Sequence, residues 1–173
     1  MSTDTFVVDK IKKAFPDAIE EIIDFRGEQT VVINGKHLQK IVKLLRDDET
    51  LRFDFLTDIC ADDYLPETPR FAVNYHFYST KTKAFVRLRV MVEDPDKGVD
   101  TLGELWRVAT WLEMEVWDLM GINFKGNGAL RRLFLPEDWQ GHPLRKDYPL
   151  GYEEVQFSFN WREVGERKPH PQD

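Results

Sequence analysis

The sequence has few residues that bind metals or carry redox chemistry: one cysteine, Cys60, and four histidines in 173 residues. An iron–sulfur cluster needs about four cysteine ligands, and a structural zinc site needs several Cys or His side chains. A single thiol also excludes an internal disulfide and a redox CxxC pair. Because Cys60 follows an apolar, strand-like run, we interpret it as a buried structural thiol. The chain is therefore expected to hold no metal and no cofactor.

Long apolar runs and excess positive charge are also missing. No run approaches the roughly 20 apolar residues of a membrane-spanning helix. Residues 1–5 lack the basic and apolar regions of a signal peptide, so the chain is expected to stay in the compartment where it is made. A net charge of −7 disfavours binding to nucleic acid or anionic lipid. Aromatic residues, by contrast, are plentiful, with five Trp and twelve Phe. That number suits both a core and a protein interface.

Hydrophobic periodicity predicts three helices and five strands. Asn34 is the expected cap of the second helix. A capping box from Thr101 to Glu104 is expected to open the third helix, and Gly121 to end it. The order α-β-β-α-β-β-β-α predicts an α+β fold with helices packed on a mostly antiparallel or mixed sheet. The expected strands are residues 19–25, 30–33, 51–59, 70–79 and 84–92.

The character of the sequence changes after residue 121. Residues 1–121 are predicted to form the α+β domain. Residues 122–173, called the arm below, are rich in turn formers and show little periodicity. About 50 residues without clear elements are unusual inside a compact domain, and they suggest a partner-bound segment. Pro136, Pro143 and Pro149 restrict its backbone, which lowers the entropy cost of docking. We therefore predict an extended C-terminal arm and tail that dock on partner subunits.

Three acidic residues near the end of the third helix are the main candidates for acid–base chemistry. Glu113, Glu115 and Asp118 could form a general acid–base pair or a metal site. The simpler interpretation is a solvated or interface surface, with Arg131 or Arg132 as counter-charges. Negative charge near a helix C-terminus is unfavourable with the helix dipole, which favours basic partners for these acids. We prefer the simpler interpretation because no nucleophile is tied to the three acids by sequence.

A glycine-containing segment, residues 125–132, ends in two arginines and could hold a phosphate. A dinucleotide-binding loop follows a strand and opens a helix, whereas this segment follows a helix and precedes a short apolar run. We interpret it as a plain loop. His142 could act as a catalytic base, but a turn or interface histidine fits better without a partnered nucleophile. The alternative of another class is a free-standing acid–base enzyme that acts on a phosphorylated substrate.

Three linked runs carry a resemblance to a known family. They are residues 113–124 (EMEVWDLMGINF), 130–139 (LRRLFLPEDW) and 141–150 (GHPLRKDYPL). Together they closely resemble the C subunit, also called the 30 kDa subunit, of respiratory NADH:quinone oxidoreductase (complex I, NDH-1). The sequence departs from the family at two places. Met114 stands where the family has Arg, and Asn127 with Gly128 stands where it has His-Pro.

The resemblance implies a non-catalytic scaffold subunit in the quinone-reducing module of complex I. FMN and iron–sulfur clusters in partner subunits would pass electrons from NADH to quinone, coupled to proton translocation. The implied partners are subunits D, B and I, with no nucleic acid. The implied location is peripheral, on the cytoplasmic side of the inner membrane, with membrane association only through the complex. An alternative is the same scaffold role in a related membrane-bound hydrogenase or ferredoxin-dependent oxidoreductase.

The motif runs are rich in Trp, Tyr and Arg, the residues that most often dominate binding energy at interfaces. Together with the resemblance, this composition predicts the residues that bind partners, as anchors or as charge pairs within the arm or across the interface. No catalytic, cofactor-binding or metal-binding residue is predicted. The predicted partner-binding residues are Glu113, Glu115, Trp117, Asp118, Arg131, Arg132, Asp138, Trp139, His142, Leu144, Arg145, Lys146, Asp147 and Tyr148.

Overall fold

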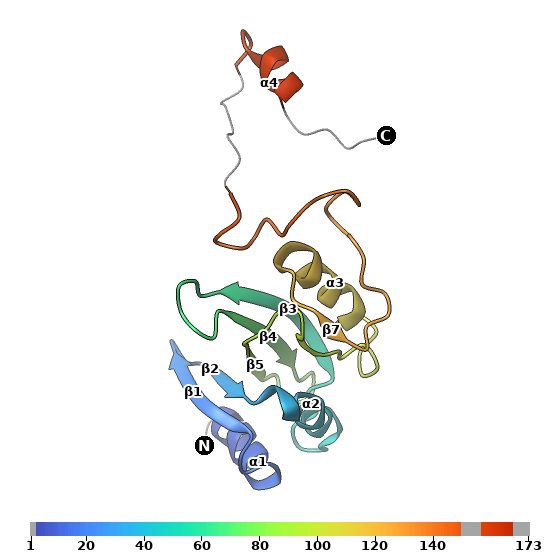
Figure 1. Cartoon of the computed structure of the whole chain (residues 1–173). Helices are drawn as coiled ribbons and strands as arrows, with labels where there is room; N and C mark the ends of the chain where they lie inside the picture. Colours follow the sequence, from blue (N-terminus) through green and yellow to red (C-terminus); the bar gives the residue numbers. More distant parts are fainter. Residues whose placement is uncertain (1–2, 150–156, 168–173) are drawn as a thin grey trace.

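The computed structural model describes residues 3–149 and 157–167, and it consists of a mixed five-stranded sheet with helices packed on it (Figure 1). This is the α+β architecture that the sequence predicts. Among the described residues, no helix has the length and apolar character needed to cross a membrane. The elements in chain order are α1 (Thr3–Ala14), β1 (Ile19–Phe25), β2 (Glu28–Ile33), the 3-10 helix η1 (Gly35–His37), α2 (Leu38–Asp47), β3 (Phe55–Asp63), β4 (Phe71–Tyr78), β5 (Phe85–Val92), β6 (Val99–Asp100), α3 (Ala109–Met120), β7 (Phe124–Lys125) and α4 (Trp161–Arg167).

The sheet has the strand order β1-β2-β5-β4-β3. Three of its pairings are antiparallel, namely β1 with β2, β3 with β4, and β4 with β5. The central pair, β2 with β5, is parallel, with Val31 opposite Leu88. A parallel pair needs a crossover connection, and here the chain between the two strands forms α2 and the β3–β4 hairpin. The sheet is therefore mixed.

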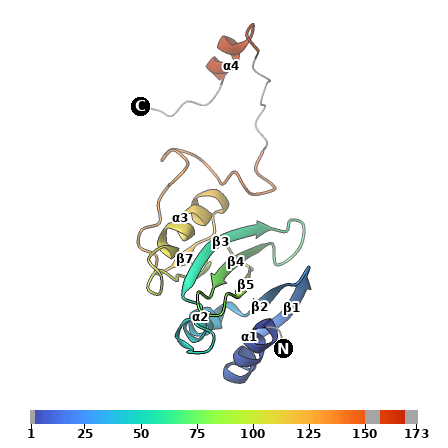
Figure 2. The same ribbon diagram turned by 180° about the vertical axis from the view of Figure 1, so that it is seen from behind.

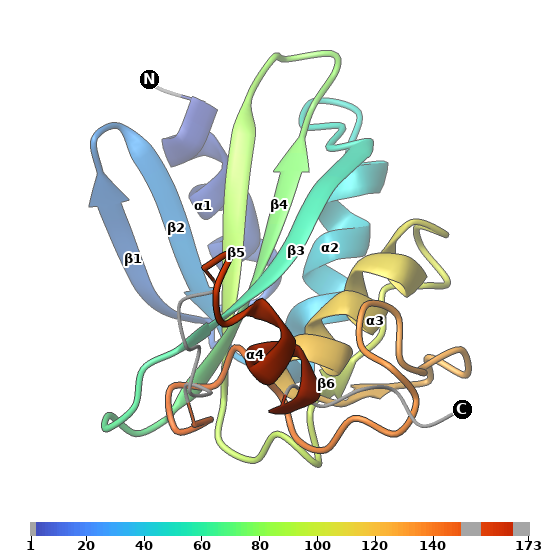
Figure 3. The same ribbon diagram turned by 90° about the horizontal axis from the view of Figure 1, so that it is seen from above.

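Helices α1 and α2 lie on the same face of the sheet (Figures 1 and 2). Strand β5 shows how the sequence produces this, because its side chains alternate between the two faces. Val86, Leu88 and Val90 are buried in the core, whereas Arg87 and Arg89 point to the other face and are partly exposed. We call that second face the open face. It is the side seen in Figure 3, where α1 and α2 lie behind the strands.

The core between the helices and the sheet is apolar, and its largest fully buried side chains include Phe53, Tyr75 and Phe77. Helix α2 presents a stripe at helical spacing to it, with Leu38, Ile41, Val42 and Leu45 all buried. Asn34 caps η1, which runs directly into α2, through a hydrogen bond from the Lys36 N–H to its side chain at 3.1 Å. Asn34 is therefore a cap, as predicted, but of η1, whereas the residue at the start of α2 itself is His37, which makes no side-chain capping bond.

Helix α3 lies beside β3 (Figure 1), but it begins at Ala109 and not at the predicted capping box. The capping-box prediction is wrong, because the Thr101 oxygen accepts the Gly103 N–H at 2.9 Å in a turn and α3 begins only at Ala109. Glu104 is exposed, while Thr101 donates its hydroxyl to Glu113 Oε2 at 2.6 Å. The predicted end at Gly121 is correct. This glycine has φ of +70° and donates its N–H to the Trp117 carbonyl at 2.9 Å.

Strand β3 also differs from its predicted span. It begins at Phe55, although Leu51 and Phe53 are fully buried. Between them Arg52 has φ of +45°, which interrupts an extended strand. At the other end β3 continues to Asp63, so Cys60 lies within the strand. Its thiol is half-buried on the open face, 3.7 Å from His76 Nε2, and burial raises its pKa. The expectation of a buried thiol is therefore met only in part, because Cys60 is half-buried.

The arm begins inside the packed body. Ile122 and Phe124 are buried in the core, and β7 pairs in parallel with β6. From residue 126 to residue 149 the chain forms turns and loops that run around α3 (Figure 1). Helix α4 was not expected from the sequence. The Asn160 side chain accepts the Phe157 N–H at 2.6 Å just before this helix starts.

Candidate functional site: the arm at the end of α3

The arm caps the C-terminal end of α3. The Leu119 carbonyl accepts the backbone N–H of Leu144 at 3.1 Å. Arg145 donates from Nε to the Met120 carbonyl at 2.7 Å and from Nη2 to the Gly121 carbonyl at 3.2 Å. The last carbonyls of a helix have no partner within the helix, and a cation placed there complements the helix dipole. The arm therefore supplies both the hydrogen bonds and the positive charge that this end of α3 needs.

Gly121 allows the arm to approach this closely. A Cβ atom at this position would lie 2.4 Å from His142 Cδ2 and 2.5 Å from Arg145 Nη2. His142 Nδ1 lies 2.9 Å from the Asp118 carbonyl, and since a carbonyl only accepts, Nδ1 carries the proton. Burial is the main cause that lowers the pKa of His142. We conclude that this histidine is a neutral, structural contact between the arm and the helix.

Asp118 fixes the first part of the arm to α3. Its carboxylate is fully buried, and Oδ2 accepts the backbone N–H groups of Leu133, Phe134 and Leu135 at 2.9, 2.8 and 3.1 Å. Oδ1 accepts Arg132 Nη1 at 2.9 Å. Burial alone would raise the pKa of Asp118, but these donors outweigh it and hold the pKa below its usual value. A carboxylate with four donors is a strong anchor for a chain that has no regular structure of its own.

Arg132 holds the loop from residue 132 to residue 141 of the arm together. Besides Asp118, its Nη2 donates to the carbonyls of Trp139 at 2.8 Å and Gly141 at 3.1 Å. The guanidinium also lies over the Trp117 ring, 5.5 Å from its centroid, within cation–π range. The planar fork of arginine can make these contacts at once, which an ammonium group cannot. One side chain therefore sets the path of residues 132–141 over the helix.

A second attachment joins the arm to the loop between β3 and β4. Arg70 makes a two-pronged ion pair with Asp63, at 2.9 and 2.7 Å, and another with Asp147, at 2.9 and 2.7 Å. Asp63 also accepts the backbone N–H of Lys146 at 2.8 Å. The hydrogen bonds from Arg70 are the main cause that lowers the pKa of Asp63. The part of the arm around Lys146 and Asp147 is thus bound to the sheet as well as to α3.

Glu113 makes a third junction, inside the domain. Its buried carboxylate accepts the Thr101 hydroxyl and the Leu102 N–H, both at 2.6 Å, and the Asn127 side-chain amide at 2.9 Å. These three donors are neutral, and burial raises the pKa of Glu113. Asn127 is one of the residues that departs from the family pattern, and here it has a definite role. Met114, the other departure, is 2% exposed and packs as an apolar residue.

Apolar side chains remain on the outer surface of the arm. Leu133, Phe134 and Leu144 are exposed by 36%, 63% and 59%, while their backbone N–H groups are bound to the last turn of α3. These three side chains therefore lie near the end of α3, on a backbone that hydrogen bonds to α3 hold in place. We call these three residues the apolar patch of the arm. Exposed apolar residues on a fixed backbone are typical of a protein-binding surface.

The structure distributes the predicted partner-binding residues between the inside of the chain and its surface, and their role in binding partners stays a prediction. The Trp139 indole nitrogen is buried without a hydrogen-bond partner within residues 3–149 and 157–167. The side chains that bind within this chain include Glu113, Asp118, Arg132, His142, Arg145 and Asp147. The half-buried side chains are Glu115, Trp117, Trp139 and Tyr148, and the exposed ones include Arg131, Asp138, Leu144 and Lys146.

Sequence reasoning missed the pairing of Arg70 with Asp63 and Asp147. Arg70 and Asp147 are 77 residues apart, and no periodic pattern links them. The available signal was weak. Asp63 and Arg70 flank a short loop that contains Pro66 and Pro69, so they had to lie close to each other. Nothing in the sequence placed Asp147 beside them.

The arrangement does not favour the acid–base alternative. Glu113 and Asp118 are both 0% exposed, and each carboxylate is already surrounded by donors from its own chain. The glycine-containing loop that could have held a phosphate uses Asn127 and Arg132 for internal bonds. A substrate would have to displace these contacts to reach either acid.

The family model and the related sequences that match this chain all belong to one protein family. The family model described as "Respiratory-chain NADH dehydrogenase, 30 Kd subunit" matches residues 31–154. The C subunit of the NADH-quinone oxidoreductase of Roseiflexus sp. (strain RS-1) is 42% identical over 163 residues, which is 94% of each chain. That of Geobacter sulfurreducens is 42% identical over 151 residues, covering 87% of this chain and 92% of the relative.

Two solved structures resemble the fold. A trypsin-resistant fragment of Nqo5, residues 1–134 of that protein, superposes with a TM-score of 0.60 at 29% identity and covers 73% of this chain and 98% of the fragment. A chain of the membrane-bound sulfane sulfur reductase, an archaeal respiratory membrane complex, superposes with a TM-score of 0.73 over 99% of this chain and 97% of its own length. At 18% identity, the second likeness concerns the fold alone.

Proposed function

Because the chain belongs to the family of the 30 kDa subunit of the respiratory-chain NADH dehydrogenase, we propose that it is a non-catalytic scaffold in the quinone-reducing module of NADH:quinone oxidoreductase. Its partners in this proposal are subunits D, B and I. FMN and iron–sulfur clusters in other subunits carry electrons from NADH to quinone, and the transfer is coupled to proton translocation. The chain binds peripherally, on the cytoplasmic side, through its partners.

The observation that carries this proposal is how the arm is held. Its backbone is bound to α3 through Asp118 and Arg145 and to the sheet through Arg70, while the apolar patch faces outward. A segment fixed in this way loses little conformational entropy when it docks. Burial of Phe134 and Leu144 against a neighbour would then stabilise the complex by about 1.5–3 kcal/mol for each fully buried side chain.

Such a subunit supports catalysis through geometry. Electron transfer to quinone depends on how the subunits that carry clusters and quinone are placed, and a rigid brace keeps them in register. The proposal assigns no proton transfer or redox step to any residue of this chain.

The test is a pull-down of the tagged full-length chain from gently solubilised membranes, with mass spectrometry of the retained proteins. We expect subunits that carry FMN and iron–sulfur clusters to be retained in fixed proportion to the chain. Recovery of the cluster-bearing subunits without a flavin-bearing one would instead indicate the same scaffold role in a membrane-bound hydrogenase or ferredoxin-dependent oxidoreductase. Recovery of a free monomer would contradict the scaffold proposal.

A further inference from the structure

The open face of the sheet carries a row of aromatic side chains at one end. Phe55 on β3 is opposite Tyr78 on β4, and Tyr78 is opposite Phe85 on β5. Residues directly opposite each other on neighbouring strands point to the same face. The rings of Tyr78 and Phe85 lie 4.5 Å apart, centroid to centroid. Phe55 and Phe85 are exposed by 55% and 66%, so this row is a substantial apolar area on the face that α1 and α2 leave uncovered.

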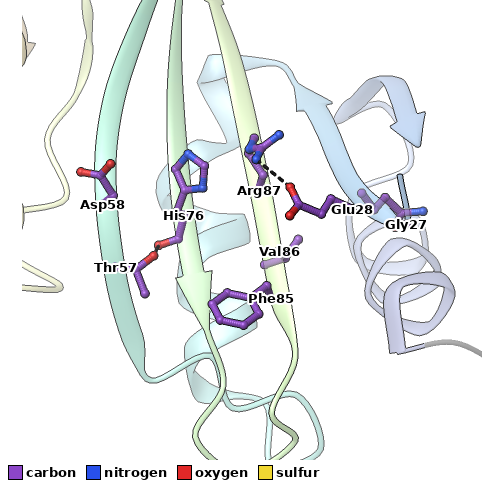
Figure 4. Close-up of a pocket in the computed structure, with 9 residues that line it drawn as sticks. Gly27, Glu28, Thr57, Asp58, His76, Phe85, Val86 and Arg87 are labelled. Atoms are coloured by element: carbon purple, nitrogen blue, oxygen red, sulfur yellow. Dashed lines mark hydrogen bonds and ion pairs between the residues drawn. The ribbon is translucent and has the colours of Figure 1, made fainter. Parts of the chain in front are cut away.

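A hollow of about 380 Å³ adjoins this row, between β3–β5 and the turn of the β1–β2 hairpin (Figure 4). Phe85 forms its apolar side. The polar side is formed by Asp58, His76 and Arg87 on successive strands and by Glu28 at the start of β2. In Figure 4 these side chains stand on the near side of the sheet, while the helices lie behind it. The hollow therefore opens on the same face as the aromatic row.

The hollow carries more negative than positive charge. Its one arginine, Arg87, is already bound, to Glu28 Oε2 at 3.1 Å and to Thr30 Oγ1 at 3.2 Å. Asp58 is an exposed carboxylate on the opposite wall, and Glu28 keeps 75% of its side chain exposed. Burial is the main cause that lowers the pKa of His76, so this imidazole is neutral at neutral pH and adds no positive charge. Two carboxylates thus face one cation beside the exposed ring of Phe85.

We propose that this hollow is a docking site for a neighbouring subunit, which inserts an arginine side chain between Asp58 and the Phe85 ring and covers the aromatic row with apolar residues. A guanidinium pairs with a carboxylate and stacks on an aromatic ring, and this hollow is lined by one exposed group of each kind, Asp58 and Phe85. A second copy of the chain fits less well, since each copy carries a net charge of −7. The inference rests on the proposed function, because only assembly into a complex supplies this neighbour.

The site is tested by placing a photo-crosslinking phenylalanine analogue at position 85 in the full-length chain and irradiating the assembled complex. We expect one partner subunit to be crosslinked, at a peptide that contains an arginine. The control is the same analogue at Phe6 on α1, which is 43% exposed and belongs to a helix on the other side of the sheet. A crosslink to a second copy of this chain, or no crosslink specific to position 85, would overturn the proposal. If the pull-down still recovers the partner subunits, the scaffold proposal survives that result.

A charge reversal tests the basic side chain itself. Asp58→Lys should reduce the yield of the position-85 crosslink several-fold, because it places a second cation where the partner's arginine is expected. The matched control is Glu49→Lys, an exposed carboxylate on the loop after α2. Circular dichroism of both purified variants checks that the fold is retained. Equal crosslink yields for the two variants would rule out a basic side chain at this site.

Discussion

Arg132 Nη1 lies 2.9 Å from Asp118 Oδ1, and this ion pair binds the first part of the irregular arm to α3. The Asp118 side chain is fully buried and that of Arg132 is 14% exposed. Burial of two charges is costly unless hydrogen bonds satisfy their remaining groups, and here the three backbone N–H groups of residues 133–135 do so for the carboxylate. The pair therefore has a structural role in this chain, whatever else the arm contacts.

Replacement of Asp118 tests that role. Asp118→Asn leaves the buried Arg132 without its counter-charge and puts an amide donor among backbone donors, so we expect a loss of about 3–5 kcal/mol in unfolding free energy. The measurement is urea unfolding of the purified chain, followed by tryptophan fluorescence. Glu115→Gln on the same helix is half-buried and should change the unfolding free energy by less than about 0.5 kcal/mol. Similar small losses in both variants would contradict the assigned role.

The same carboxylate predicts a dependence on pH. The pKa of Asp118 is lowered from 3.8 in the folded chain, so its stabilising contribution is present above that value and is lost as the pH falls through the folded pKa. We therefore expect the difference in unfolding free energy between wild type and Asp118→Asn to be constant near pH 7 and to narrow below about pH 3.8. Urea titrations of both proteins over a pH series measure this difference. A difference that widens on acidification would contradict a lowered pKa for Asp118 in the folded chain.

The two carboxylates bound by Arg70 should not contribute equally. The side chain of Asp63 is 3% exposed, whereas that of Asp147 is 53% exposed. Arg70→Ala leaves a nearly buried carboxylate without its cation and should cost about 1.5–3 kcal/mol, typical for hydrogen bonds to a charged group. Asp147→Ala should cost clearly less, because solvent screens its pair. Chemical unfolding of both variants measures the two losses of unfolding free energy. A larger loss for Asp147→Ala than for Arg70→Ala would refute this ranking.

Gly121 is required both by its backbone angle and by the arm. Gly121→Ala forces a residue with a side chain to adopt φ of +70° and places a Cβ atom against His142 and Arg145. We expect a loss of about 1–3 kcal/mol and faster trypsin cleavage within the arm. Gly128→Ala is the control, since a Cβ there meets nothing within 4 Å. If the two variants are cleaved at the same rate, the arm does not depend on this close approach.

The sequence predicted the fold well because the domain is organised by periodic patterns. The alternation in β5 and the stripe of α2 each identify a buried face directly. The capping box failed for a physical reason. The Thr101 oxygen accepts the N–H of Gly103 in a turn, and the hydroxyl donates its proton to Glu113, twelve residues away. Such a tertiary contact leaves no periodic signal.

The candidate site was predictable only in part. The arm was expected from its composition, and arginine partners were expected for the acids of α3. That expectation is confirmed for Asp118, which pairs with Arg132. It is wrong for Glu113, whose three donors are neutral. The direction in which side chains point was not accessible, because residues 126–149 have no repeating geometry from which a face can be read. The contact of Arg70 with Asp147 depends on how the arm returns to the sheet, and only the folded chain shows it.

The last prediction concerns assembly of the complex. Arg145 binds two carbonyls at the end of α3, and its guanidinium also lies over the Phe71 ring, 5.2 Å from the centroid. Arg145→Ala should loosen the arm beneath the apolar patch, and Trp139→Ala should remove a predicted anchor. We expect both variants to lower the amount of assembled complex while quinone reduction per assembled complex stays unchanged.

Blue-native electrophoresis gives the amount of complex, and NADH-dependent quinone reduction normalised to that amount gives turnover. Lys81→Ala, at an exposed residue in the β4–β5 loop away from the arm, is the control for both measurements. A scaffold acts by holding its neighbours in place. Its loss should therefore reduce the amount of assembled complex and leave the turnover of each assembled complex unchanged. Normal assembly with reduced turnover per complex would mean that the arm takes part in the reaction itself, and the scaffold proposal would then have to be abandoned.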